Sequence, residues 1–264
     1  MLPNSLKTRE IRCALLFGPP RFLSREAASA VHGAVCDALG VDDLAFRYSS
    51  MDSQAAAASR GFKIEMDRKE GRGGFAIALD HAGGQAGDPI RLLMLYRWPP
   101  SMVHVSEVFD MASGAVFGTL EGRWQTVMAE VNLRAQCETA HRDGLRYVLD
   151  RCIKLPQAWV EGLGSPLAFA SVGFEVNPAE VTQDPLDSPA RNLKVEVLRE
   201  DPSGLYIELV SRWTQLPLRP GAGPAIPVDV RMVRKFDQKP SAYVKNAQEF
   251  LIERIGALAE AGDG

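Results

Sequence analysis

One stretch of the sequence decides the fold: Val127-Met128-Ala129-Glu130-Val131-Asn132-Leu133-Arg134-Ala135-Gln136-Cys137-Glu138. Every odd-numbered position in it is apolar and, after Met128, every even-numbered position is polar. Alternation with a period of two is typical of a β-strand with one buried and one wet face. We therefore predict a long strand whose odd-numbered side chains lie in the core.

The chain before this strand predicts a regular order of elements. A short apolar strand over residues 11–17 is followed by a helix, for which Ser24 is the expected N-cap and Gly40 the expected C-cap. Four strands follow, and then a second helix with Ser106 near its start. The four strands are expected over residues 44–48, 62–66, 75–79 and 90–98, and the helix over residues 105–116.

The chain after residue 127 predicts the same order again. A helical stretch over residues 145–153 is followed by strands and by a long amphipathic helix that starts at Pro240. Hairpin signals, Glu70–Gly74 and Asp201–Gly204, fall between the third and fourth strands of each half. The strands of this second half are expected over residues 167–176, 193–198, 205–213 and 226–236.

The two halves therefore suggest an internal duplication of a β-α-β-β-β-β-α unit, with a coincidence of order as the alternative. We place the first half at residues 1–122 and the second at residues 123–264, either as two domains or as one continuous domain. Hairpin-linked strands form antiparallel sheets, and the apolar stripes of the helices can cover one face. The expected fold class is thus α+β, with one or two antiparallel sheets covered by helices.

Composition narrows the kinds of partner. The net charge is −3 with both signs interspersed, whereas proteins that bind nucleic acid present a basic surface. The first ten residues lack an apolar run, and no stretch reaches the ~18 apolar residues of a membrane span. The four cysteines form no CxxC pair and are expected as free thiols in the core. We expect a cytoplasmic protein that binds neither nucleic acid nor membranes.

The sequence offers one pair of residues as a candidate for catalysis. Gly71-Arg72-Gly73-Gly74-Phe75-Ala76 has the letters of a dinucleotide fingerprint but lies between two strands, so a hairpin turn is the better interpretation. The histidines have no metal-ligand spacing, and we expect no metal and no cofactor. His141 with Asp143, at an expected helix start, is the only acid or base candidate for catalysis.

The polar face of the long strand is the candidate binding surface. Its side chains offer a mixed ladder of hydrogen-bond donors and acceptors, which either lines a groove between the halves or forms a solvated sheet face. The residues are Glu130, Asn132, Arg134 and Gln136.

Three features of the chain resemble a sporadically distributed family of bacterial proteins of similar length. They are the early strand Glu10–Phe17, the element Asn132-Leu133-Arg134 within a central strand, and the long closing helix. The family's element continues with an aromatic residue and Ile-Asn, where this chain has Ala135-Gln136-Cys137. The family has no established activity, so the resemblance implies no functional residues.

Two functional hypotheses remain. The first is a binding or interaction protein without catalytic activity, whose partner is another protein or a second copy of the chain. The second is a small-molecule-binding protein or a hot-dog-like enzyme with a pocket between the halves, by analogy of fold alone. A pocket with His141 in its wall would favour the second hypothesis.

Overall fold

The protein is described here by a computed structural model. It covers residues 6–19, 21–52, 60–82, 88–120, 124–139, 143–153, 169–177, 186, 189–214 and 239–260. The strand expected over residues 226–236 and the candidate His141 lie outside these described residues.

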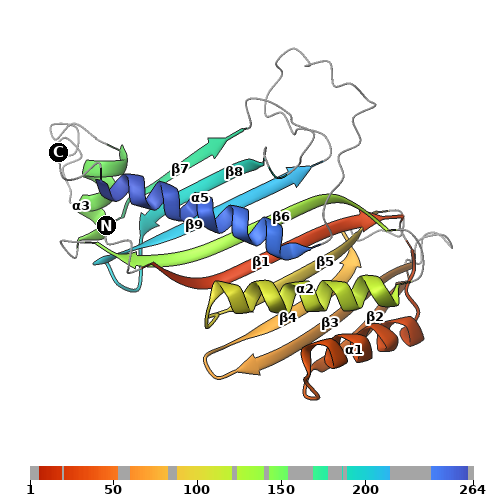
Figure 1. The fold of residues 1–264 in the computed structure, drawn as a ribbon. Coiled ribbons are helices and arrows are strands. Elements are labelled where there is room, and N and C mark those ends of the chain that lie inside the picture. The colour runs from red at the N-terminus through yellow and green to blue at the C-terminus, as the bar shows by residue number, and fades with distance from the viewer. Residues whose placement is uncertain are drawn as a thin grey trace, which may run out of the picture.

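The described strands form one antiparallel sheet of nine strands in the order β2-β3-β4-β5-β1-β6-β9-β8-β7 (Figure 1). The predicted α+β class with antiparallel pairing is therefore confirmed. The strands are β1 (Lys7–Gly18), β2 (Ala45–Asp52), β3 (Arg60–Glu70), β4 (Gly73–His81), β5 (Ile90–Arg97), β6 (Gln125–Glu138), β7 (Ser171–Val176), β8 (Ala190–Val197) and β9 (Gly204–Thr214).

Helices cover one face of this sheet. In Figure 1, α1 (Arg25–Leu39) and α2 (Met102–Thr119) lie over the first half of the sheet and α5 (Pro240–Glu260) over the second. Helix α2 packs against both of the others. The short helix α3 (Gly144–Tyr147) continues into a π-helical turn, η2 (Val148–Ile153), which contacts β7 and β8.

The core lies between the sheet and these helices. On β6 the side chains of Ala129, Val131, Leu133, Ala135 and Cys137 are buried, as the alternation predicts. The expectation for Val127 is wrong: it is half-buried, and Thr126 takes the buried position. The register against β1 shifts at this point, so one extra residue on β6 reverses the alternation locally.

The two halves join edge to edge, because β1 pairs with β6 along almost its whole length. The neighbours of this central pair differ between the halves. In the first half, the fifth strand, β5, lies beside β1, whereas in the second half the fourth described strand, β9, lies beside β6. The order of elements repeats, but the described pairing does not repeat strand for strand.

The helix termini follow their sequence signals with one correction. The hydroxyl of Ser24 accepts a hydrogen bond from the backbone N–H of Ala27 at 3.2 Å, and Gly40 ends α1 with φ 63°, as predicted. Helix α2 begins at Met102, earlier than the expected residue 105, and the hydroxyl of Ser101 caps it by accepting from the N–H of His104.

The predicted hairpin between β3 and β4 depends on a close backbone approach at Gly73. Gly71-Arg72 forms the two-residue turn, with a left-handed φ of 54° at Gly71. A Cβ atom at Gly73 would overlap the carbonyl oxygen of Arg97 on β5, so only glycine fits there. By contrast, a Cβ at Gly114 in α2 would meet no atom within 4 Å.

Alanine at these two glycines is expected to change stability in opposite directions. Gly73→Ala should lower the free energy of unfolding by more than about 1 kcal/mol, because backbone must move to admit the Cβ. Gly114→Ala should raise it by up to about 1 kcal/mol through helix propensity. Urea unfolding followed by circular dichroism measures both, and equal effects of the two variants would contradict the described packing of the β3–β4 hairpin.

Candidate functional site

The face of the sheet opposite α1, α2 and α5, called the open face here, carries the candidate binding surface. On β6 its side chains are those of Glu130, Asn132, Arg134 and Gln136, and all four are half-buried. The expected alternation thus places them together on one face. Side chains on the neighbouring strands β1 and β9 lie beside them, and within the described part of the chain α1, α2 and α5 pack on the other face.

Strand register assembles a row of alternating charge across this face. Arg134 on β6 lies directly opposite Glu10 on β1 and Glu208 on β9. Glu10 in turn lies opposite Arg97 on β5, and Glu208 lies opposite Lys194 on β8. The charge row, as we call it, therefore runs across five neighbouring strands in the order Arg97, Glu10, Arg134, Glu208, Lys194.

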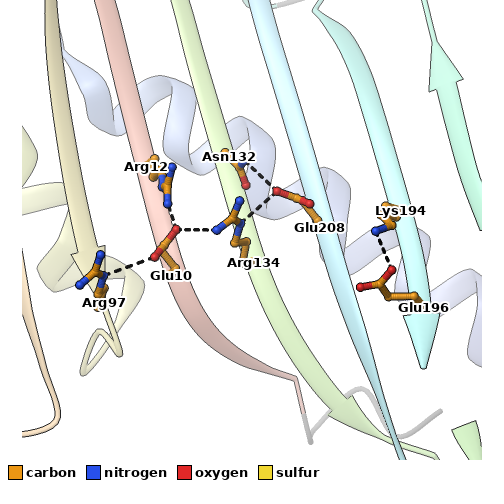
Figure 2. Close-up of polar contacts among 8 residues, drawn as sticks. All are labelled: Glu10, Arg12, Arg97, Asn132, Arg134, Lys194, Glu196 and Glu208. Atoms are coloured by element: carbon orange, nitrogen blue, oxygen red, sulfur yellow. Dashed lines mark hydrogen bonds and ion pairs between the residues drawn. The ribbon is translucent and has the colours of Figure 1, made fainter. Parts of the chain in front are cut away.

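Glu10 is the hub of the charge row, as Figure 2 shows. Its carboxylate accepts from Arg12 at 2.7 Å and from Arg134 at 3.1 Å, and it lies 3.5 Å from Arg97. The Glu10 side chain is only 14% exposed. A carboxylate this shielded is stable only when its oxygens are paired, and three guanidinium groups provide the pairing.

Arg134 links the two halves of the row. Its guanidinium donates to Glu10 at 3.1 Å and to Glu208 at 3.0 Å, so one cation bridges carboxylates from β1 and β9 (Figure 2). Asn132, two residues earlier on the same face, donates to the same Glu208 oxygen at 2.9 Å. Asn132 and Arg134 thus donate to carboxylates within the chain, and the role of this strand face as a binding surface stays a prediction.

These contacts set the ionisation of Glu208. Burial by itself raises the pKa of this carboxyl, but the hydrogen bonds from Asn132 and Arg134 and the positive charge of Arg134 outweigh it, so the pKa is lowered overall. Glu208 is therefore ionised at neutral pH. A carboxylate held in its charged form suits binding better than acid catalysis, which needs a pKa near the working pH.

An apolar patch lies beside the charge row on the open face. It consists of half-buried Leu93 and Leu95 on β5, Leu16 and the small Ala14 on β1, and Met128 on β6. Register makes them contiguous, with Leu93 opposite Ala14 and Leu16 opposite Met128. Ion pairs flank the patch on both sides: Asp80 accepts two hydrogen bonds from Arg91, and Glu130 accepts from Arg212 at 2.7 Å.

The row ends beside a strained corner at Trp98. This is the one residue other than glycine with a positive φ (48°) in the described part of the chain, a conformation that bulky residues rarely adopt. The indole ring lies 5.0 Å from the guanidinium of Arg9 and 4.6 Å from that of Arg72, and its backbone N–H donates to the carbonyl of Arg9 at 2.7 Å. The corner fixes the end of β5 and so the position of Arg97.

The catalytic candidate receives no support from the described residues. Asp143 is a helix cap, because its carboxylate accepts from the backbone N–H of Arg146 at 2.9 Å, and His141 is not among those residues. His104 is a histidine that the structure does describe: its Nε2 lies 3.1 Å from the hydroxyl of buried Tyr96, which donates to Glu70 at 2.6 Å. These bonds tie the first turn of α2 to the end of β3, a structural role.

The cysteines also lack the features of reactive groups. Cys13 and Cys137 are buried, and Cys36 and Cys152 are partly buried rather than fully in the core as expected. All four are free thiols. Burial raises the pKa of each, to about 12 for Cys137, which disfavours the nucleophilic thiolate.

A concave surface lies between α2 and α5, which come from different halves. This groove has a volume of about 540 Å³ and exposes the apolar side chains of Val103 and Ile252 at its rim. Asp110 within it is already bonded, since its carboxylate accepts from the backbone N–H of Ser241 at 2.9 Å and from its hydroxyl at 2.6 Å. The groove is thus a helix-packing seam with one carboxylate committed to capping α5.

Two further observations bear on the class of site. Within the described ranges, no group of three or more His, Cys, Asp or Glu side chains is arranged to hold a metal ion. None of the helices in the described part of the chain combines the length and apolar character that a membrane crossing requires.

Comparison with known proteins adds no assignment: no protein-family model matches the chain, and no curated protein matches it either.

Sequence reasoning found the β6 part of this site and missed the rest. Glu10, Arg97, Glu208 and Lys194 lie on four other strands, up to 198 positions from one another as their numbers show. Their polar positions within alternating strands were a signal that they share a sheet face. Strand order and register decide which of these side chains lie next to one another, and no local sequence pattern predicts strand order or register.

Removing the Glu208 charge should change how stability depends on pH. The pKa of Glu208 in the folded state is lowered below its unfolded value of about 4.3. The stabilisation of the folded state by the ionised carboxylate is therefore fully present above pH ~4.3 and is lost as the pH falls through the folded-state pKa. The wild type should therefore be more stable than Glu208→Gln at pH 7, and the difference should shrink as the pH falls below about 4.3. Denaturant unfolding across this range measures it. A difference independent of pH would contradict the pairing with Arg134.

Proposed function

We propose that this chain is a binding protein that holds another protein molecule on its open face. One observation carries the proposal: a row of alternating charges borders an apolar patch on the sheet face opposite α1, α2 and α5. Within the described part of the chain none of α1, α2 and α5 covers this face, and a face of this kind is typical of sites that are completed by a partner.

The chemistry of the face supports a protein partner. It presents carboxylates and cations in near-equal number, which does not suit the uniformly negative backbone of a nucleic acid. Half-buried leucines beside Arg and Glu side chains resemble the apolar centre and polar rim of protein interfaces. Arginine in such a setting is frequently a residue whose removal costs most affinity.

The alternative, a small-molecule site or hot-dog-like enzyme with a pocket between the halves, has the α2–α5 groove as its best location. The groove is open and carries a capping carboxylate at Asp110. Deeply enclosed pockets with few convergent polar groups are the usual form of small-molecule sites. The open face therefore supports the first hypothesis better.

Matched pairs of apolar-to-charged substitutions test this proposal. Leu93→Asp with Met128→Asp alters the apolar patch, and Val103→Asp with Ile252→Asp alters the rim of the groove at well-exposed positions. Proteins retained from a lysate of the source organism by the wild-type chain are identified, purified and titrated against each double variant. The open-face variant should bind at least about tenfold more weakly, since each buried charge left unpaired costs more than ~1.4 kcal/mol. The groove variant should bind as the wild type does.

The reverse pattern, with affinity lost only in the groove variant, would overturn the proposal. Circular dichroism and thermal unfolding of both double variants provide the folding control. The proposal is also contradicted if the open-face substitutions weaken the binding of none of the retained proteins and the chain does not bind a second copy of itself.

A further inference from the structure

We propose that the partner on the open face is a second copy of this chain, packed face to face about a two-fold axis that runs parallel to the strands between β1 and β6. This inference rests on the proposed function, because it names the occupant of the same face. Under this rotation the charge row is complementary to itself, and two pairs of apolar side chains also meet.

The charge row fixes where the axis can lie. A rotation about an axis parallel to the strands reverses the order of the strands and keeps the position along them. With the axis midway between β1 and β6, Glu10 faces Arg134 of the second copy, and Arg134 faces Glu10 of the second copy. The same rotation places Arg97 against Glu208 of the second copy, because β5 then faces β9.

Two pairs of apolar side chains match under the same rotation. Leu95 on β5 lies two residues from Arg97, and Val210 on β9 lies two residues from Glu208, so these two half-buried side chains face each other across the axis. Leu16 on β1 and Met128 on β6 lie directly opposite in the register, so Leu16 faces Met128 of the second copy. Between these two levels Leu93 faces Arg212 of the second copy, whose guanidinium is paired with Glu130 within its own chain.

Other two-fold axes give less of this match. An axis between β6 and β9 would also set Arg134 against Glu208 of the second copy, but it would set Met128 against Thr214 and Asn132 against Val210. An axis that runs across the strands through the charge row would place each charge against its own copy, Glu10 on Glu10 and Arg134 on Arg134. Like charges facing each other disfavour association. An axis centred on a strand rather than between strands would place the charge at its centre on its own copy as well.

The available area suits a stable dimer. The axis between β1 and β6 is close to the middle of the nine-stranded sheet, so four strands on each side find a facing strand. At about 4.8 Å between strands and about 3.4 Å per residue, eight strands of about seven residues cover roughly 900 Å². Standard protein interfaces bury about 800 Å² on each partner. Two twisted sheets pack face to face at a small angle about 10 Å apart, which leaves room for these side chains.

Complementary substitutions on facing positions test both the partner and the axis. Leu95→Asp and Val210→Arg each introduce a charge that, in a homodimer, faces an apolar side chain. Each variant alone should dimerise at least about tenfold more weakly than the wild type by sedimentation velocity over a concentration series, given an unpaired charge at the interface. Mixed in equal amounts they should form a heterodimer, because one introduced carboxylate then faces one introduced guanidinium and the other Leu95–Val210 contact remains native.

Three outcomes decide the inference. A wild-type dimer, weaker variants and a restored mixed dimer support it, whereas Val103→Asp on the helical side should leave dimerisation unchanged. A monomer at about 100 µM, where a pair with micromolar Kd is mostly dimeric, overturns it. A dimer that neither variant weakens also overturns it. A further result is a monomeric chain that a different protein binds, and binds more weakly in the Leu93→Asp, Met128→Asp variant. That result would support the proposed function and overturn only the proposal that the partner is a second copy.

Discussion

The antiparallel pairing of β1 with β6 is the constraint on which the rest of the structure depends. It joins the two halves of the chain into one sheet and one continuous core. Both strands place apolar side chains on the helical face and carry Glu10 and Arg134 on the other. Side chains alternate strictly along a strand, so a shift of this pairing by one residue would move the apolar side chains of the shifted strand to the open face and its charged side chains to the core. The register of one strand pair therefore fixes the core and the candidate site together.

The charge row is a consequence of that register and contributes to holding it. Glu10 and Glu208 are shielded carboxylates, and their charges would be costly without Arg134 between them. Each ion pair on a surface contributes little by itself, but a network in which one cation serves two carboxylates on neighbouring strands penalises any other alignment. The row thus specifies which residues meet, while the apolar face beneath the helices contributes most of the folding free energy.

The fold could be predicted from the sequence further than the site could. Strands, helices and caps are local features, and the alternation of β6 and the signals at Ser24 and Gly40 were sufficient for them. Local patterns failed at two places. The bulge at Val127 reverses the alternation of β6 against its neighbour β1, and α2 begins at Met102 behind the cap Ser101, earlier than the expected residue 105. The site required knowledge of which strands are neighbours. Four of the five residues of the charge row come from other strands than β6, so only Arg134 could be found from its own segment.

An alternating row has a property that a row of one sign lacks. A uniformly charged face binds any surface of opposite sign, and its affinity depends on release of counterions. In the charge row, Glu10, Arg134 and Glu208 are already paired within the chain. A partner that matches the alternation therefore adds contacts without the full cost of desolvating unpaired charges. A partner displaced by one strand spacing would instead place like charge on like charge across the whole row. The same geometry that pins β1 to β6 would therefore make binding on this face selective for position, with the apolar side chains at Leu16, Leu95 and Met128 contributing the affinity.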